Sequence, residues 1–132
     1  MLEGINHITF AVSSLEKSLS FYVSLLGMKL VVKWNHGAYL SVGKQWICLS
    51  VDNPVPAKDY THIAFSVAES EFARYVSRLN QSEIKTWKRN KSEGQPLYIL
   101  DPDGHKLEIH SGNLDSRLEH LKISPYAGLT WH

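Results

Sequence analysis

The feature that most constrains this chain is an internal repeat. Residues 6–12 (NHITFAV) and 61–67 (THIAFSV) match position by position, so His62 corresponds to His7. Each copy is followed by apolar residues at helical spacing and then by three short segments typical of strands. We therefore predict an α+β fold of two paired βαβββ modules that form a curved, partly open barrel around a metal site. The modules span about 1–52 and 60–112 of a single domain, and 113–132 form a short C-terminal helix and tail.

The expected boundaries follow from caps and turn residues. Ser13 stands three residues before Glu16, which is the spacing of a capping box, and Gly27 is a suitable C-terminal cap for the first helix. A second helix is expected through Phe72–Leu79, and Asn113 should cap a third over 113–121. A linker that contains prolines occupies 52–59. The predicted strands are 6–12, 29–35, 37–42 and 46–51 in the first module, and 61–67, 84–88, 96–100 and 105–110 in the second.

Composition limits the classes of partner. The 132 residues carry a net charge of +1 with 43% apolar residues, which is ordinary for a globular domain and gives no electrostatic reason to expect nucleic acid. The sequence shows no membrane span and no signal peptide. Cys48 is the single cysteine and fits a reducing cytoplasm, where we expect a small buried thiol rather than a nucleophile.

The segment 101–110 (DPDGHKLEIH) places a carboxylate at an unusual position. Asp-Pro-Asp-Gly is a turn, because proline presets φ and glycine tolerates positive φ. In the strand that follows, Leu107 and Ile109 share one face, and Glu108 shares the other face with Lys106 and His110. A carboxylate on an inward face requires water, a partner or a metal ion.

The same alternation gives every module one face that no helix covers. Two histidines at equivalent positions of a duplicated module, together with Glu108, form the facial set typical of a divalent transition metal with open positions. A lone inward histidine is more often a hydrogen-bonded core residue, but the duplication favours metal binding. His110 remains an alternative ligand, and His36, His105, His120 and His132 are predicted to lie at the surface. The predicted inward residues are His7, Thr9, Tyr39, Ser41, Trp46, Cys48, Ser50, His62, Lys88, Tyr98 and Glu108.

These motifs resemble a known family. The paired modules are similar to the vicinal oxygen chelate (glyoxalase/bleomycin resistance) superfamily, and within it to the fosfomycin-resistance glutathione transferases of the FosA type. The resemblance runs nearly from end to end, and the Ser-Glu-Gly loop together with the three ligand positions makes it specific. The segments that carry it are 6–9, 37–40, 59–62, 90–94, 101–108 and 125–128.

The resemblance implies an enzyme that adds glutathione to the epoxide of fosfomycin, with Mn(II) as metal and K⁺ as activator. It implies His7, His62 and Glu108 as metal ligands and a homodimer whose modules pair across chains. Thr9 and Tyr39 are then catalytic, with Thr9 near the epoxide oxygen. The substrate pocket is formed by Thr9, Trp46, Tyr60, Lys88, Ser92, Tyr98 and Arg117, and the potassium loop by Asn90, Ser92, Gly94 and Tyr98.

Two departures from the family pattern affect these expectations. Pro96 stands where the family usually has serine, so a hydroxyl and an N–H are missing near the potassium loop. The linker at 52–59 is short compared with the family pattern, and we expect this to alter the edge of the dimer.

Three other functions are open to the same fold. A glyoxalase-type isomerase needs a fourth protein ligand, usually a Glu on the middle strands, and an epoxide hydratase needs a carboxylate base to activate water. No Asp or Glu occurs between Glu16 and Asp52, which argues against both. A drug-sequestering protein would bind without metal or chemistry, and the intact ligand set argues against it. Relatives that use bacillithiol or cysteine lack the Ser-Glu-Gly loop.

Overall fold

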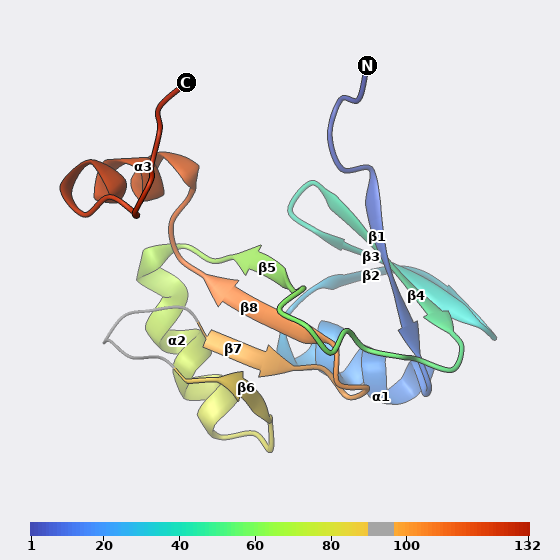
Figure 1. The fold of residues 1–132 in the computed structure, drawn as a ribbon. Helices are drawn as coiled ribbons and strands as arrows, with labels where there is room; N and C mark the ends of the chain where they lie inside the picture. The colour runs from blue at the N-terminus through green and yellow to red at the C-terminus, as the bar shows by residue number, and fades with distance from the viewer. Residues whose placement is uncertain (90–96) are drawn as a thin grey trace.

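The computed structural model describes residues 1–89 and 97–132, which form two four-stranded sheets and helices beside them (Figure 1). The first module contains β1 (His7–Val12), α1 (Leu15–Leu19), a π-helical continuation η1 (Ser20–Leu25), β2 (Lys29–Trp34), β3 (Gly37–Val42) and β4 (Gln45–Val51). Its strand order is β1-β4-β3-β2, with β1 parallel to β4 and the other pairs antiparallel.

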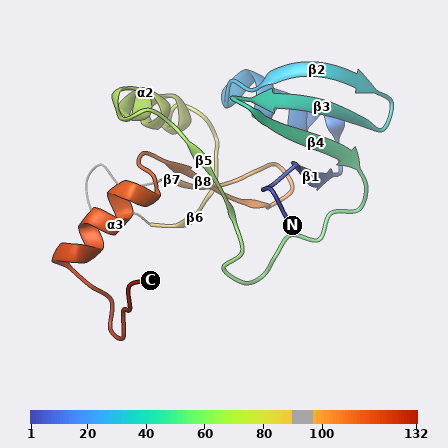
Figure 2. The same ribbon diagram turned by 90° about the horizontal axis from the view of Figure 1, so that it is seen from above.

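The second module repeats this topology. It contains β5 (Ile63–Ser66), α2 (Glu69–Asn80), β6 (Thr86–Lys88), β7 (Leu97–Leu100) and β8 (Lys106–His110), in the order β5-β8-β7-β6. α3 (Leu114–Ile123) begins at the predicted Asn113 cap and lies beyond the end of the second sheet in Figure 1; Figure 2 shows that it stays on the side of the second module. The two sheets do not close on each other, so the predicted α+β fold with a curved open barrel is confirmed.

The start of the first helix differs from its predicted cap. Ser14, not Ser13, accepts the N–H of Lys17 and caps α1. Both the N–H and the hydroxyl of Ser13 instead donate to the carboxylate of Asp103 in the other module. The capping-box prediction was wrong because a partner distant in sequence competes for this serine. The helix ends as predicted, with Gly27 at a φ of 82°.

A β-bulge interrupts the pairing at the outer edge of each sheet. In β2 the register shifts between Leu30 and Val32, and in β6 it shifts between Thr86 and Lys88. A bulge inserts one unpaired residue and reverses the alternation beyond it. The residues that face the uncovered side of each sheet therefore change at these points.

The two modules share one hydrophobic core. Apolar side chains from both sheets and their helices, among them Phe10, Tyr22, Leu79 and Leu107, form a single buried cluster. Burial of this continuous apolar surface is the main force that holds the modules side by side.

Hydrogen bonds between the modules fix their relative orientation. Tyr22 donates a buried hydrogen bond of 2.7 Å to Asp101, and His105 Nε2 lies 2.7 Å from the carbonyl of Ala11. We call the 101–105 turn together with Tyr22, Ala11 and Ser13 the intermodule clasp. The prediction that His105 lies at the surface was wrong, because its ring is half-buried against Phe10; His36, His120 and His132 are exposed as expected.

Candidate metal and substrate site

Glu108 is the chemically distinctive residue of the second sheet. It lies in the middle of β8, paired with Ala64 on one side and Tyr98 on the other, and only 9% of its surface is exposed. Two imidazoles approach its carboxylate: His62 Nε2 lies 3.9 Å from Oε2, and His110 Nδ1 lies 3.7 Å from Oε1. Neither distance is a hydrogen bond.

The hydrogen bonding of His62 determines what its free nitrogen offers. His62 Nδ1 lies 2.7 Å from the carbonyl oxygen of Tyr60, which can only accept, so Nδ1 carries the proton. In the neutral ring the lone pair on Nε2 then faces a carboxylate that also only accepts. Two acceptors that face each other across 3.9 Å leave a place for a cation, and the carbonyl contact is the usual support of a metal-binding histidine. The residues therefore fit a divalent metal.

His110 is the second histidine beside the carboxylate of Glu108. Its Nδ1 is buried and has no hydrogen-bond partner among the described residues. A buried polar atom without a partner is costly, and the nearest complementary group is Oε1 of Glu108. His110 thus lies near Oε1 of Glu108, whereas His62 lies near Oε2.

The uncovered face of the first sheet carries a row of aromatic rings. His7 stacks on Trp46 with centroids 4.3 Å apart, Trp46 meets Tyr39 at 5.1 Å, and Tyr39 meets Trp34 at 4.9 Å. The register places Thr9 beside Cys48 and Cys48 beside Tyr39 on the same face. His7 Nδ1 lies 2.8 Å from the side-chain oxygen of Asn6, which leaves its Nε2 free to bind, as in His62.

One chain does not bring all three predicted ligands together. In the described part of the chain, residues 1–89 and 97–132, no three His, Cys, Asp or Glu side chains come close enough to hold a metal ion. The physical reason is the placement of the sheets: His7 lies on the edge strand of one sheet, whereas Glu108 lies in the other sheet and His62 directly precedes its strand β5. Each face therefore carries part of the predicted set.

Lys88 lies within an aromatic cluster at the second face. Its Nζ donates to Tyr60 Oη at 2.6 Å and lies 4.8 and 4.7 Å from the ring centroids of Tyr60 and Tyr98. The hydrogen bond with Tyr60 raises the pKa of Lys88, so it remains a cation at neutral pH. Burial, with the nearby Glu108 carboxylate, raises the pKa of Tyr98 and keeps its hydroxyl protonated. The cluster presents a cation and hydroxyl donors, as an anionic ligand requires.

The remaining predicted residues lie elsewhere. Arg117 is exposed on α3, and no hydrogen bond or ion pair joins its side chain to another residue within the two described ranges. Cys48 is half-buried rather than fully buried. Asn90, Ser92, Gly94 and Pro96, which include most of the predicted potassium loop, lie outside the described residues.

Two tryptophans belong to these faces and were not predicted. The bulge in β2 places the ring of Trp34 against that of Tyr39. The bulge in β6 brings the ring of Trp87 close to two others, with its centroid 5.2 Å from that of His62 and 5.1 Å from that of Tyr98. Trp87 Nε1 also donates to the carbonyl of Leu107 on the strand that carries Glu108. Strict alternation places Trp87 on the face opposite Lys88, so the sequence pattern misses it.

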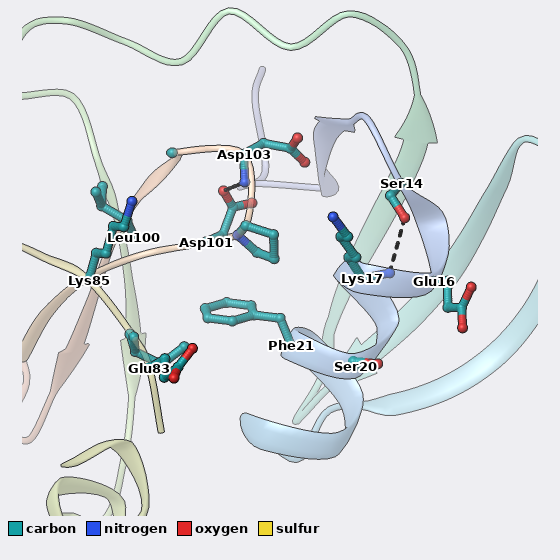
Figure 3. A pocket seen from close by; sticks show the side chains of 13 residues that line it. Ser14, Glu16, Lys17, Ser20, Phe21, Glu83, Lys85, Leu100, Asp101 and Asp103 are labelled. Atoms are coloured by element: carbon teal, nitrogen blue, oxygen red, sulfur yellow. Dashed lines mark hydrogen bonds between the residues drawn. The ribbon is translucent and has the colours of Figure 1, made fainter. Parts of the chain in front are cut away.

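A large hollow among the described residues lies away from these groups. It measures about 820 Å³ and is lined by α1 with the residue before it, by the start of η1, by residues 83–85 and by the 100–104 turn (Figure 3). Figure 3 shows Phe21 between Lys17 and Glu16 on one side and Glu83 and Lys85 on the other. It contains none of the predicted site residues, and its mixture of charges selects no class of ligand. The candidate site residues therefore lie on the aromatic faces and not in this hollow.

Comparison with protein families agrees with the fold. The sequence model of the Glyoxalase/Bleomycin resistance protein/Dioxygenase superfamily matches residues 4–109. This chain belongs to that superfamily. None of the helices in the described ranges is both long enough and apolar enough to cross a membrane.

Within the superfamily, the chain is similar to thiol transferases and to a fosfomycin resistance protein. The chain is 50% identical over 136 residues to glutathione transferase FosA of Serratia marcescens, with 99% of this chain and 96% of that protein covered. It is 41% identical over 128 residues to metallothiol transferase FosB of Lysinibacillus sphaericus, with 92% and 91% covered. A crystal structure of the fosfomycin resistance protein FosX from Listeria monocytogenes with Mn(II) and sulfate superposes with a TM-score of 0.78 at 26% identity, covering 91% and 98%. The predicted resemblance to the FosA type is confirmed.

Proposed function

We propose that this superfamily member is a metal-dependent transferase that adds glutathione to the epoxide of fosfomycin and so inactivates the antibiotic. The observation that carries the proposal is the 50% identity to a glutathione transferase FosA along nearly the whole of both chains. The residues of the two faces supply the groups that this reaction needs.

The bonds formed and broken define those needs. The glutathione thiolate attacks an epoxide carbon, a C–S bond forms, the C–O bond breaks, and the released oxygen takes up a proton. Thr9 lies on the first face, where its hydroxyl can donate to that oxygen, and Tyr39 on the same face serves as hydrogen-bond partner or base for the thiol. We assign Trp46 and Tyr60 to the lining of the thiol and substrate cavity.

The anionic end of fosfomycin requires cations and donors. Lys88 is held between two tyrosine rings, and its ammonium is directed along the face that carries Tyr98. We assign the phosphonate to Lys88, Tyr98, Ser92 and Arg117, whose guanidinium matches phosphonate geometry in a bidentate way.

His7, His62 and Glu108 would hold the divalent metal, which we propose to be Mn(II). The FosX structure that contains Mn(II) supports a divalent ion in this fold. When bound, such an ion acts as a Lewis acid toward oxygen. The protein contributes fixed ligands: Glu108 is held in the sheet, and each histidine has its Nδ1 engaged by an oxygen.

The separation of His7 from Glu108 within one chain supports a homodimer in which modules pair across chains. We propose that His7 of one chain completes the site that His62 and Glu108 of the other begin, and that α3, on which Arg117 is exposed, contributes Arg117 to the neighbouring site. We propose that residues 1–132 form a single superfamily domain of two modules. We also propose K⁺ activation through the 90–94 loop and Tyr98, and a cytoplasmic location, where glutathione is abundant.

The direct test is product analysis. The protein is incubated with fosfomycin, glutathione and Mn(II), and the products are identified by mass spectrometry, with reactions lacking either glutathione or metal as controls. We expect a glutathione adduct that requires both. A diol formed without glutathione would identify a hydrating enzyme, and tight binding without product would identify a sequestering protein. The absence of any Asp or Glu between Glu16 and Asp52 disfavours hydration.

A further inference from the structure

The two candidate ligands of the second module are held in different ways. Glu108 lies inside the sheet, hydrogen-bonded through the ladder to the strands on both sides. His62 precedes β5, whose first paired residue is Ile63, opposite Leu107. The ladder therefore fixes Glu108 but does not fix His62, which depends on the linker before it.

Lys106 holds that linker. Its ammonium donates to the carbonyl of Ala57 and, at 2.8 Å, to the carbonyl of Asp59. Lys106 lies on β8 two residues before Glu108, and continuation of the register places it beside His62. One half-buried cation thus connects the strand of one ligand to the segment that leads to the other.

Two further hydrogen bonds carry this restraint to the imidazole. The carboxylate of Asp59 accepts the N–H of Thr61 at 2.9 Å, and the carbonyl of Tyr60 accepts from His62 Nδ1 at 2.7 Å. The second bond determines which nitrogen of His62 carries the proton. The position of the Tyr60 carbonyl, and so the tautomer of His62, depends on the linker being held.

We propose that Lys106 is a positioning residue for His62: by binding the carbonyls of Ala57 and Asp59 it orders residues 57–61, so that His62 keeps Nδ1 protonated and presents Nε2 toward Glu108. The metal-binding part of this inference rests on the proposed function, whereas the tautomer part does not. Lysine suits the task because its ammonium offers three donors and can serve two carbonyls at once. Such outer partners of a ligating histidine typically change metal affinity by about ten- to a hundredfold when they are removed.

The test uses the full-length protein and four variants. Lys106→Met removes the donors and keeps the aliphatic stem, and Lys106→Gln is a second version of the same loss. Lys106→Arg retains two or more donors and is expected to rescue. Lys58→Met is the matched control, because it removes an equal charge from an exposed position of the same linker.

The first measurement is made on metal-free protein. Two-bond ¹H–¹⁵N NMR spectra of ¹⁵N-histidine-labelled protein at about pH 8.5, where imidazoles are ordinarily neutral, report the tautomer of each ring. We expect His62 to be predominantly the Nδ1–H form in the wild type, in Lys58→Met and in Lys106→Arg. In Lys106→Met and Lys106→Gln we expect a mixture that includes the Nε2–H form. An unchanged His62 tautomer in folded Lys106→Met or Lys106→Gln would overturn the proposal.

The second measurement is Mn(II) affinity by electron paramagnetic resonance or calorimetry. We expect Lys106→Met to weaken binding by about tenfold or more, with Lys58→Met unchanged and Lys106→Arg close to the wild type. Equal affinity in Lys106→Met and the wild type contradicts the metal-binding role. If the wild type itself binds no Mn(II), the proposed function fails, while the tautomer comparison still decides whether Lys106 positions His62.

Discussion

A single carbonyl oxygen, that of Tyr60, determines what His62 can offer. Because Nδ1 donates to this oxygen, Nε2 faces the Glu108 carboxylate as a second acceptor. The two acceptors cannot hydrogen-bond each other, but both can bind a cation. His110 approaches the other carboxylate oxygen with a buried nitrogen that has no hydrogen-bond partner among the described residues. At the scale of single residues, the site is defined by two acceptors that face each other, His62 Nε2 and the Glu108 carboxylate, and by the buried Nδ1 of His110 beside them.

Replacing Glu108 by Gln tests this electrostatic requirement. The amide keeps the size of the side chain but loses the charge that a divalent ion needs, so we expect Mn(II) binding measured by calorimetry to fall at least about a hundredfold. Glu16→Gln, an exposed carboxylate on α1, is the control and should bind like the wild type. Unchanged binding in Glu108→Gln would remove this residue from the ligand set.

At the scale of elements, bulges and the clasp decide how faces and modules meet. The bulges in β2 and β6 each bring a tryptophan to an uncovered face, Trp34 beside Tyr39 and Trp87 beside His62. The clasp fixes the turn before β8 against the end of β1 through Asp103 and His105, and against Tyr22 of η1 through Asp101. The strand of Glu108 in one sheet and the strand of His7 in the other are thereby held in a fixed relation.

The bond between Tyr22 and Asp101 in the clasp predicts a pH-dependent stability. Tyr22→Phe leaves a buried carboxylate without one donor, so we expect the free energy of unfolding at pH 7 to fall by about 1–3 kcal/mol. Burial, and then the Asp101 carboxylate, raise the pKa of Tyr22 above its usual 10. A raised folded-state pKa gives stability that is fully present below pH 10 and is lost as the pH rises above it.

The measurement is urea unfolding of both proteins from pH 7 to 11.5. Above pH 10 the deficit of Tyr22→Phe relative to the wild type should shrink by up to about 1.4 kcal/mol per pH unit, because only the wild type loses this contribution. Tyr126→Phe, at an exposed position, should follow the wild type throughout. A constant deficit across this pH range would contradict the linkage.

At the scale of the whole molecule, one chain presents two incomplete faces. The first carries His7, Thr9 and the aromatic row, and the second carries His62, Glu108 and the Lys88 cluster. The core and the clasp hold the two modules of a chain together, so we expect the faces to be completed by a second copy and not by closure of one chain.

Complementation between inactive variants tests this arrangement. His7→Ala and Glu108→Gln should each be inactive alone. If sites form across chains, a mixed dimer contains one site with both mutations and one site with neither. Refolding the two variants together at equal concentration should then restore about a quarter of wild-type fosfomycin turnover, because about half of the dimers are mixed and each has one intact site. Sites formed within one chain would give no recovery. Size-exclusion chromatography checks that the refolded protein is dimeric, and a different affinity tag on each variant shows that mixed dimers have formed.

The sequence by itself determined what repeats and what alternates. The copies at 6–12 and 61–67 predicted two modules, and the period of two predicted that His7, Thr9, Tyr39 and Trp46 share one face and that Glu108 opposes Leu107 and Ile109. These inferences succeed because strand geometry is local: each side chain takes its direction from its immediate neighbours.

Only the tertiary structure decided the features that depend on residues distant in sequence. Ser13 bonds Asp103 instead of capping a helix, His105 reaches Ala11, and Lys106 binds carbonyls of the linker. The two bulges reverse the alternation, so Trp34 and Trp87 join faces from which a regular pattern excludes them. Local propensity could not give these results, because each is selected by a competing partner that folding alone brings near. The same reason explains why an inward direction for His7 and Glu108 did not determine whether they meet within one chain.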